Sequence, residues 1–116
     1  MEFELSEEQI VIRDSVRRYC QNNYRWTDRL EAMHSAEGFS REHWAAYSQF
    51  GWLGVALPED VGGFGGSAVE MALILEEFGR FLVLEPFLSC VTLAAQVVNE
   101  AGHSKQRKAL LPAIIQ

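Results

Sequence analysis

The sequence predicts an all-α fold, a bundle of about five to six helices. Apolar residues recur at intervals of three and four positions, the spacing of one face of a helix. The segments between these patterns carry helix caps and glycines rather than the two-residue turns that join paired strands. At 116 residues the chain is long enough for one hydrophobic core, so we expect a single domain, residues 1–116.

Composition and charge narrow the class of protein. Hydrophobic residues make up 48% of the chain, which is ordinary for a globular domain, and the net charge of −6 argues against nucleic acid or an anionic membrane as a partner. The longest uncharged run, residues 86–99, is too short to span a membrane. Cys20 and Cys90 lie in helical patterns and no signal peptide precedes them, so we expect reduced thiols and a cytoplasmic location.

The first helix is marked by a capping box, because Ser6 stands three residues before Gln9. One face of the helix then carries a run of apolar side chains: Ile12, Val16, Tyr19 and Cys20. Its charged side chains point mostly away from that face, and we expect them to be solvated: Arg13, Asp14, Arg17 and Arg18.

The middle of the chain predicts two shorter helices. Residues 21–39 are irregular apart from a short helix over 26–34, which ends before Gly38. Ser40 caps the next helix, which carries Trp44 on its apolar face.

Three helices are expected after the glycine-rich stretch. Ser67 and Glu70 form a second capping box, and Glu76 is placed to pair with Arg80 one turn later. The apolar stripe of this helix consists of Ala68, Met71, Ala72, Leu75, Gly79 and Leu82. The next helix covers residues 87–101, opened by Pro86 and stopped by Gly102, and Ser104 is predicted to cap the last one.

The segments 68–80 and 87–100 are apolar almost all round. A helix with apolar surface on every side needs packing partners on every side. About five or six helices supply few such partners, so we expect an exposed apolar patch, of the kind that marks an interface.

The stretch LPEDVGGFGGSAVE, residues 57–70, contains Gly63-x-Gly65-x-x-Ala68, the spacing of a dinucleotide-binding fingerprint. Glu85 follows about 20 residues later, where an acid that binds ribose belongs. Against this, residues 58–61 separate the glycines from any preceding strand, and two of them are acidic. Pro86 also opens a helical segment, so no series of strands follows. We therefore expect a loop over residues 58–66, with glycines supplying positive φ and close approach.

Several segments, taken together, resemble the N-terminal helical domain of acyl-CoA dehydrogenases. They cover nearly the whole chain in order: Phe3-x-Leu5-Ser6-Glu7-Glu8-Gln9, Gly51-x-x-Gly54-x-x-x-Pro58-Glu59-x-x-Gly62-Gly63-x-Gly65, Glu76-Glu77-Phe78-Gly79-Arg80, and Gly102 followed by Gln106-x-x-x-Leu110-Leu111-Pro112. Residues 84–87 depart from the commonest fatty-acyl enzymes. They are more similar to a subgroup that includes small subunits of heteromeric enzymes for dicarboxylic or steroid side-chain acyl-CoA esters.

The resemblance implies a flavin-dependent enzyme that oxidises an acyl-CoA thioester and passes electrons to an electron-transfer flavoprotein. In that family FAD and the carboxylate base belong to later domains. The chain would then be the N-terminal domain of a longer, oligomeric subunit, with no FAD, metal or catalytic residue of its own. Glu76 and Glu77 are accordingly expected to be solvated or ion-paired rather than catalytic.

The resemblance also implies a set of substrate-binding residues. When Ala101-Gly102 is aligned with the family's Ala-Gly stop, Ser89, Cys90 and Leu93 match residues that line the acyl pocket. The alternative is that Ser89 and Cys90 are small because two helices pack closely there.

Two other functions remain open on the sequence. The chain could be a stand-alone helical interaction module with no enzymatic context. It could also be a small nicotinamide dinucleotide-binding domain, which requires a parallel sheet.

Overall fold

Helices make up the regular structure of the protein. The structure is a computed structural model that describes residues 3–116, and within this range no β-strand forms. The six α-helices are α1 (Glu7–Asn23), α2 (Trp26–His34), α3 (Arg41–Gln49), α4 (Ala68–Arg80), α5 (Gln96–Ala101) and α6 (Ser104–Ile115). Between them lie two short 3₁₀ turns, η1 (Trp52–Gly54) and η2 (Glu59–Val61), and a π-helical segment, η3 (Leu88–Ala95). The predicted all-α fold is confirmed, and the parallel sheet of the dinucleotide hypothesis does not form in residues 3–116.

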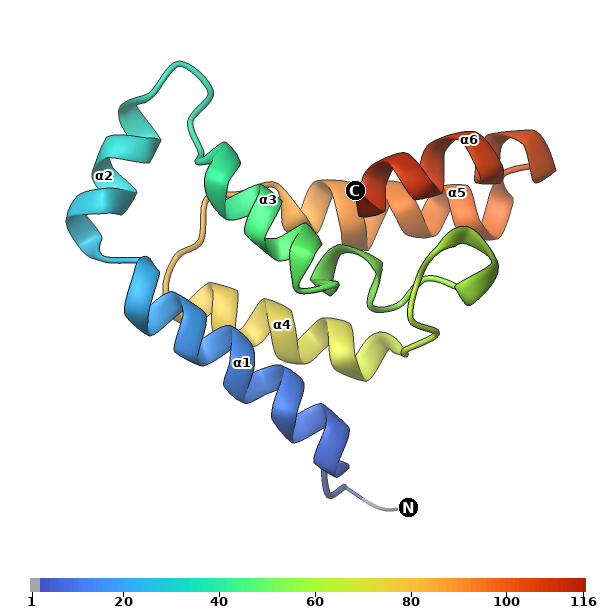
Figure 1. Ribbon diagram of the computed structural model, residues 1–116, viewed down its shortest axis with the longest axis horizontal. Helices are drawn as coiled ribbons and strands as arrows, with labels where there is room; N and C mark the ends of the chain where they lie inside the picture. Colours follow the sequence, from blue (N-terminus) through green and yellow to red (C-terminus); the bar gives the residue numbers. More distant parts are fainter. Residues whose placement is uncertain (1–2) are drawn as a thin grey trace.

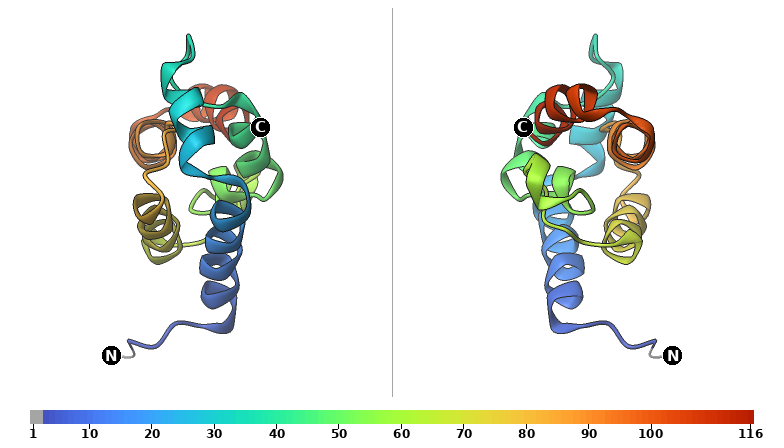
Figure 2. Two further views of the ribbon diagram at one scale, coloured as in Figure 1. Left: turned by 90° about the vertical axis from the view of Figure 1, so that its left-hand side faces the viewer. Right: turned by 90° about the vertical axis from the view of Figure 1, so that its right-hand side faces the viewer.

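The helices form two layers joined through α3 and the turns that follow it. Helix α1 packs along α4, while α6 packs against η3 and α5 and covers both 3₁₀ turns (Figure 1). Helix α4 and the η3–α5 helix lie on the same side of the molecule, one above the other (Figure 2). Each helix described is too short or too polar to cross a membrane.

Aromatic side chains fill the centre of the main core. Tyr47 of α3 is fully buried, and its ring centroid lies 4.9 Å from Phe78 of α4 and 5.5 Å from Trp52. Phe78 in turn meets Phe87 edge to face at 5.3 Å, a favoured aromatic geometry. A second, smaller cluster lies under the glycine-rich turn and consists of Leu57, Val61, Ala95 and Leu111.

The caps predicted from sequence define most helix starts. Both capping boxes form, with Ser6 and Ser67 as the capping residues, and Ser40 caps α3 as predicted. The prediction for the last helix is wrong by one residue. His103 caps it, because its ring Nδ1 accepts from the backbone N–H of Gln106.

The inward face of α4 differs from the predicted stripe. Ala72 and Gly79 are exposed, whereas the buried residues are Met71, Leu73, Ile74, Glu77 and Phe78. The larger side chains of α4 are therefore the buried ones, whereas Ala72 and Gly79 face solvent. Among the large apolar residues of α4, Val69 alone is exposed, so this helix contributes little to the expected apolar patch.

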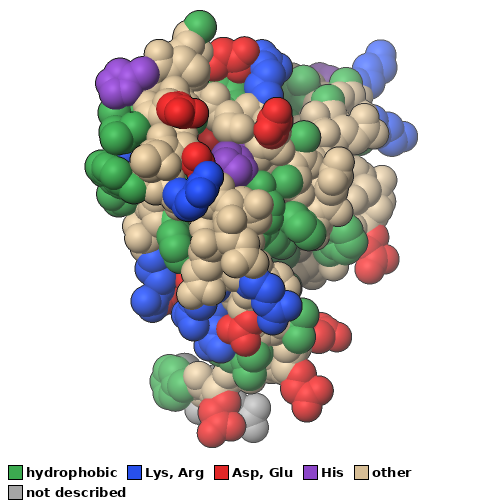
Figure 3. Space-filling model, turned by 60° about the vertical axis from the view of Figure 1, so that its left-hand side comes forward, with side chains coloured by type: hydrophobic (Ala, Val, Ile, Leu, Met, Phe, Trp, Pro, Cys, Tyr) green, Lys and Arg blue, Asp and Glu red, His purple; other side chains and the backbone are tan. Residues whose placement is uncertain are grey.

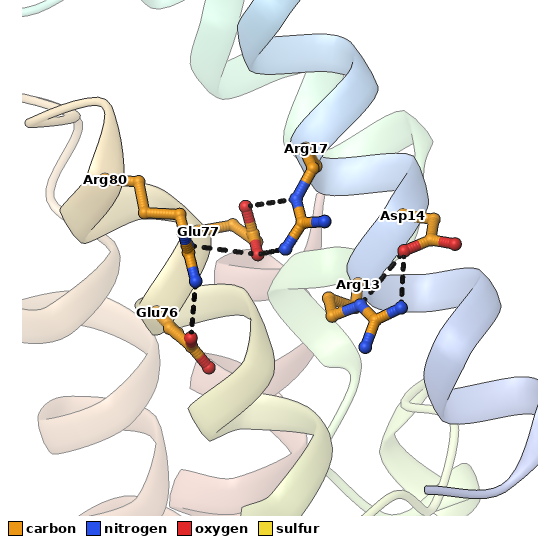
Figure 4. A network of polar contacts seen from close by, with 6 residues as sticks. All are labelled: Arg13, Asp14, Arg17, Glu76, Glu77 and Arg80. Atoms are coloured by element: carbon orange, nitrogen blue, oxygen red, sulfur yellow. Dashed lines mark hydrogen bonds and ion pairs between the residues drawn. The ribbon is translucent and has the colours of Figure 1, made fainter.

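A buried ion pair joins α1 to α4 (Figure 4). Glu77 is fully buried and accepts from Arg17 twice, at 2.7 Å from Nη2 and 3.1 Å from Nε. Arg80 approaches the same carboxylate at 3.5 Å, and the predicted pair between Arg80 and Glu76 forms at 3.0 Å. The prediction that Arg17 is solvated is therefore wrong, because Arg17 is paired with Glu77. Its hydrogen bond to Glu77 raises the pKa of the guanidinium.

The glycine-rich stretch is a closed turn and not an anion-binding loop. Its successive backbone N–H groups donate to carbonyls of the turn itself or of the residues just before it: Gly62 to Glu59, Gly63 to Pro58, Phe64 to Gly54, Gly65 to Leu57 and Gly66 to Val55. A pyrophosphate needs such donors free and pointing outward. Gly62 and Gly65 have positive φ, and a side chain on Gly63 would collide with the Leu57 carbonyl. The predicted role of the glycines, positive φ and close approach, is confirmed.

We predict that Arg17→Ala lowers the free energy of unfolding by about 3 kcal/mol, because it leaves the buried Glu77 carboxylate with Arg80 alone. Urea unfolding of the chain measures this. Arg18→Ala is the matched control, since Arg18 is exposed on the same helix, and it should change stability by less than about 0.5 kcal/mol. Equal losses in the two variants would contradict the role of the ion pair.

A second prediction concerns two glycines whose replacement by alanine should change stability in opposite directions. Gly63→Ala should destabilise the chain by about 1–3 kcal/mol, because the new methyl group meets the Leu57 carbonyl. Gly79→Ala should stabilise it by about 0.5–1 kcal/mol, since Gly79 is helical and has open space around it. Thermal and urea unfolding of both variants provide the measurement. A neutral Gly63→Ala would show that the turn relaxes easily.

Candidate functional site

The helix after Pro86 is the most unusual element of the molecule. Residues 88–95 form a π-helix, in which the hydrogen bonds run from i to i+5, and the chain returns to α-helical geometry at Gln96. Side chains five apart therefore share a side in this segment. Runs of π-helical structure are rare and occur frequently at functional sites.

This geometry gathers apolar side chains on the exposed side of the helix. Leu88 and Leu93 are 56% and 58% exposed, and Val97, one turn further, is 63% exposed. Val91 and Ala95 are buried on the opposite side. The expected apolar patch is thus present on the helix over residues 88–101; we call these three exposed residues the apolar strip.

The three residues expected to bind substrate lie on two sides of this helix. Ser89 and Leu93 are exposed, and the Ser89 hydroxyl donates to the Pro86 carbonyl at 3.3 Å. Cys90 is half-buried and packs against the main core. The structure brings Ser89 and Leu93 to the same side and leaves Cys90 behind them.

Two cavities lie between α4 and the η3–α5 helix. The larger, the turn cavity, has a volume of about 620 Å³ and lies at the glycine-rich end, lined in part by Gly65, Gly66, Ala68, Met71, Thr92 and Gln96. The smaller, the apolar cavity, has a volume of about 290 Å³ and lies where α4 ends and η3 begins. Most of its wall is apolar: Leu75, Phe78, Leu82, Val83, Phe87 and Leu88. Leu88 belongs both to this wall and to the apolar strip, so the cavity opens beside the strip.

The turn cavity contains polar groups that the sequence analysis missed. Thr92 Oγ1 is buried and has no hydrogen-bond partner within residues 3–116. Gln96 Nε2 donates to the Ala56 carbonyl at 3.3 Å. Their signal in the sequence is weak, because two uncharged polar residues in a long apolar run look like ordinary helix surface.

Glu85 also lines the apolar cavity, but its carboxylate is committed to the fold. The side chain is 5% exposed, and it accepts from the Tyr47 hydroxyl at 2.9 Å and from the Ser40 N–H at 3.0 Å. Burial, and after it the charge of Glu85, raises the pKa of Tyr47, so Tyr47 stays a neutral donor. Glu85 therefore anchors the turn between α4 and η3 to helix α3.

The remaining reactive residue types form no site in the part of the chain described. Residues 3–116 contain no group of three or more side chains placed to hold a metal ion. Burial raises the pKa of Cys20 to about 12, which keeps its thiol protonated at neutral pH. On the face seen in Figure 3, acidic and basic side chains are interspersed, with hydrophobic side chains between them.

Comparison with known proteins identifies the family. The family model "Acyl-CoA dehydrogenase, N-terminal domain" matches residues 6–116, nearly the whole chain. The chain belongs to the acyl-CoA dehydrogenase family.

Individual relatives agree with this assignment. The chain is 30% identical to the acyl-CoA dehydrogenase IpdE2 of Mycolicibacterium smegmatis, over 87% of this chain and 32% of the relative. It is 26% identical to the acryloyl-CoA reductase (NADH) of Anaerotignum propionicum, over 97% of this chain and 28% of the relative. The solved Tcur3481-Tcur3483 steroid ACAD superposes with a TM-score of 0.88 at 28% identity, over 94% of this chain and 30% of that one. The chain thus spans about a third of the length of its relatives.

The unpaired hydroxyl in the turn cavity gives a third prediction. Thr92→Val should raise the free energy of unfolding by about 1 kcal/mol, because it removes a buried polar group without changing the side-chain shape much. The control is Thr27→Val on α2, where the hydroxyl is exposed and the change should stay below about 0.5 kcal/mol. Urea unfolding measures both. A loss of stability in Thr92→Val alone would mean that the hydroxyl has a partner, such as a bound water.

Proposed function

We propose that this chain is the N-terminal domain of a flavin-dependent acyl-CoA dehydrogenase. Such an enzyme removes hydrogens from the α and β carbons of an acyl-CoA thioester. The observation that carries the proposal is the family match over residues 6–116. The apolar cavity and the strip beside it are consistent with a wall that receives an acyl chain.

The role of these residues in the parent enzyme would be to line the acyl pocket. Ser89 and Leu93 lie on the exposed side of η3, where an acyl chain can contact them. Cys90 packs against the core behind them and so positions this part of the helix. The apolar strip would be covered by other domains or subunits of the same enzyme, because exposed apolar surface of this kind is typical of interfaces.

The flavin would be held outside this chain. The amides of residues 62–66 donate to backbone carbonyls of residues 54–59, so this turn does not supply the donors that a pyrophosphate needs. FAD bound by the rest of the subunit would supply the hydride acceptor, and an electron-transfer flavoprotein would take up the electrons. The part played by residues 1–116 is apolar contact and exclusion of water from the acyl chain.

The reverse reaction is a second candidate function for the same scaffold. The similarity to a protein named acryloyl-CoA reductase supports reduction of an enoyl-CoA as a second candidate. For the whole enzyme we propose an oligomer in the cytoplasm, in keeping with the apolar strip and two free cysteines.

The test uses the full-length protein encoded with this chain. We expect it to purify with flavin and to convert acyl-CoA and enoyl-CoA into one another in the presence of an electron carrier. A coding sequence that continues past Gln116 into a β domain would separate this proposal from a stand-alone interaction module. A full-length protein without flavin and without activity in either direction would contradict the proposal.

A substitution then tests the pocket assignment. Leu93→Trp should lower kcat/KM for long acyl-CoA esters relative to short ones by about tenfold or more, since the indole fills space on the exposed side of η3. Cys90→Trp would test the pocket less directly, because overpacking the core would also lower the free energy of unfolding by about 1–3 kcal/mol. Val11→Trp on α1, equally exposed and distant in sequence, is the control. An unchanged ranking of substrates in a folded, flavin-loaded Leu93→Trp variant would contradict the assignment of Leu93 to the acyl pocket.

A further inference from the structure

In the turn that follows α4, a leucine occupies the left-handed position. Leu82 has φ of 51°, and it is the one residue other than glycine with positive φ in residues 3–116. The Leu82 N–H donates to the Gly79 carbonyl and the Val83 N–H donates to the Phe78 carbonyl, at 3.3 and 3.0 Å. These two bonds define a Schellman motif, in which the left-handed residue is usually glycine.

The backbone of the turn gives no reason for a leucine. A side chain on a left-handed residue is strained, so glycine would form the same two hydrogen bonds at lower cost. The leucine side chain recovers little of this cost by burial, since it is 56% exposed. Residues held in sparsely populated conformations cluster at ligand sites, where the surrounding structure maintains them.

The surrounding structure does hold Leu82 in place. Arg29 of α2 donates from Nε to the Leu82 carbonyl at 2.7 Å. Two residues later, the Leu84 N–H donates to the Tyr24 hydroxyl at 2.8 Å, and Glu85 is bound to Tyr47 and Ser40. The turn is therefore tied to Tyr24 at the end of α1, to α2 and to α3, and these contacts fix where the Leu82 side chain stands.

That position is the edge of the apolar cavity. Leu82 lines the cavity from the α4 side, and Leu88 lines it from the η3 side. Both are 56% exposed, so both stand where the cavity meets solvent. The cavity is small, about 290 Å³, so one side chain at its edge controls a large share of its width.

We propose that Leu82 determines substrate specificity by limiting the width of the apolar cavity, so that it admits slender acyl chains and excludes bulky ones. This inference rests on the proposed function, because it takes an acyl group as the occupant. Leu82 does not act on the reacting atoms. Its strained backbone maintains an apolar side chain at a place where the turn itself would favour glycine.

The experiment compares Leu82→Gly and Leu82→Ala in the flavin-loaded, full-length protein. Both remove the obstructing side chain, so both should raise kcat/KM for a branched or ring-bearing acyl-CoA, relative to a straight-chain one, by about tenfold or more. Only Leu82→Gly relieves the backbone strain, so it should raise the thermal unfolding midpoint while Leu82→Ala does not. Leu110→Ala on α6, an exposed leucine outside this cavity, should change neither quantity.

The possible failures are distinguishable. An unsubstituted protein that converts no acyl-CoA would overturn the proposed function and this inference with it. An active protein whose substrate ratio is unchanged in both Leu82 variants would overturn this inference alone. A Leu82→Gly variant with a lower melting midpoint than Leu82→Ala would also overturn it, because the backbone at position 82 would then not be strained in the way that the inference requires.

Discussion

The buried carboxylate of Glu77 is the constraint on which the arrangement of the helices depends. It stands on the inner face of α4, away from water, and the guanidinium of Arg17 on α1 supplies two hydrogen bonds to it. A buried charge is costly unless it is paired, so α4 has one acceptable position along α1. The opposite side of α4 forms a wall of both cavities, and their location therefore follows from this ion pair.

A second buried carboxylate fixes the other wall. Glu85 binds the hydroxyl of Tyr47 and a backbone N–H at the start of α3, and it stands three residues before η3 begins. Tyr47 is also the centre of the aromatic core, so the start of η3 is tied to the best-packed part of the molecule. Neither carboxylate has the free, solvent-facing geometry of a catalytic base. These two carboxylates hold α4 and the η3–α5 helix in fixed positions, with the cavities between them.

The sequence was sufficient for features encoded by neighbouring residues. The serine caps of α1, α3 and α4, the glycine stop at Gly102 and the closed glycine turn depend on residues a few positions apart, and each was predicted correctly. The pairing of Arg17 with Glu77 was missed because the partners are 60 positions apart. The cap formed by His103 was missed because imidazole seldom takes that role.

The cavities, and which side of the 88–101 helix faces solvent, could not be predicted from local sequence patterns for a different reason. An almost uniformly apolar segment has no polar residues to mark which side faces out, so its sequence fits an α-helix and a π-helix equally well. The residues expected to bind substrate could be placed on this helix, but their division between its two sides depends on the i to i+5 hydrogen bonds. The left-handed conformation of Leu82 was likewise not predicted, because the contact that holds it comes from Arg29, 53 positions away on α2.

The π-helical segment also sets the rotational phase of everything that follows it. An α-helix turns by about 100° per residue, and the wider i to i+5 turn rotates less per residue, so the same eight residues wound as an α-helix would direct α5 to a different side relative to α4. Leu88 and Leu93 would no longer share a side, and Ala95 would leave the small core cluster that it forms with Leu57, Val61 and Leu111. The directions of α5 and α6 therefore depend on the hydrogen-bond pattern of this segment more than on the identity of its apolar residues, because many apolar substitutions leave the i to i+5 pattern unchanged.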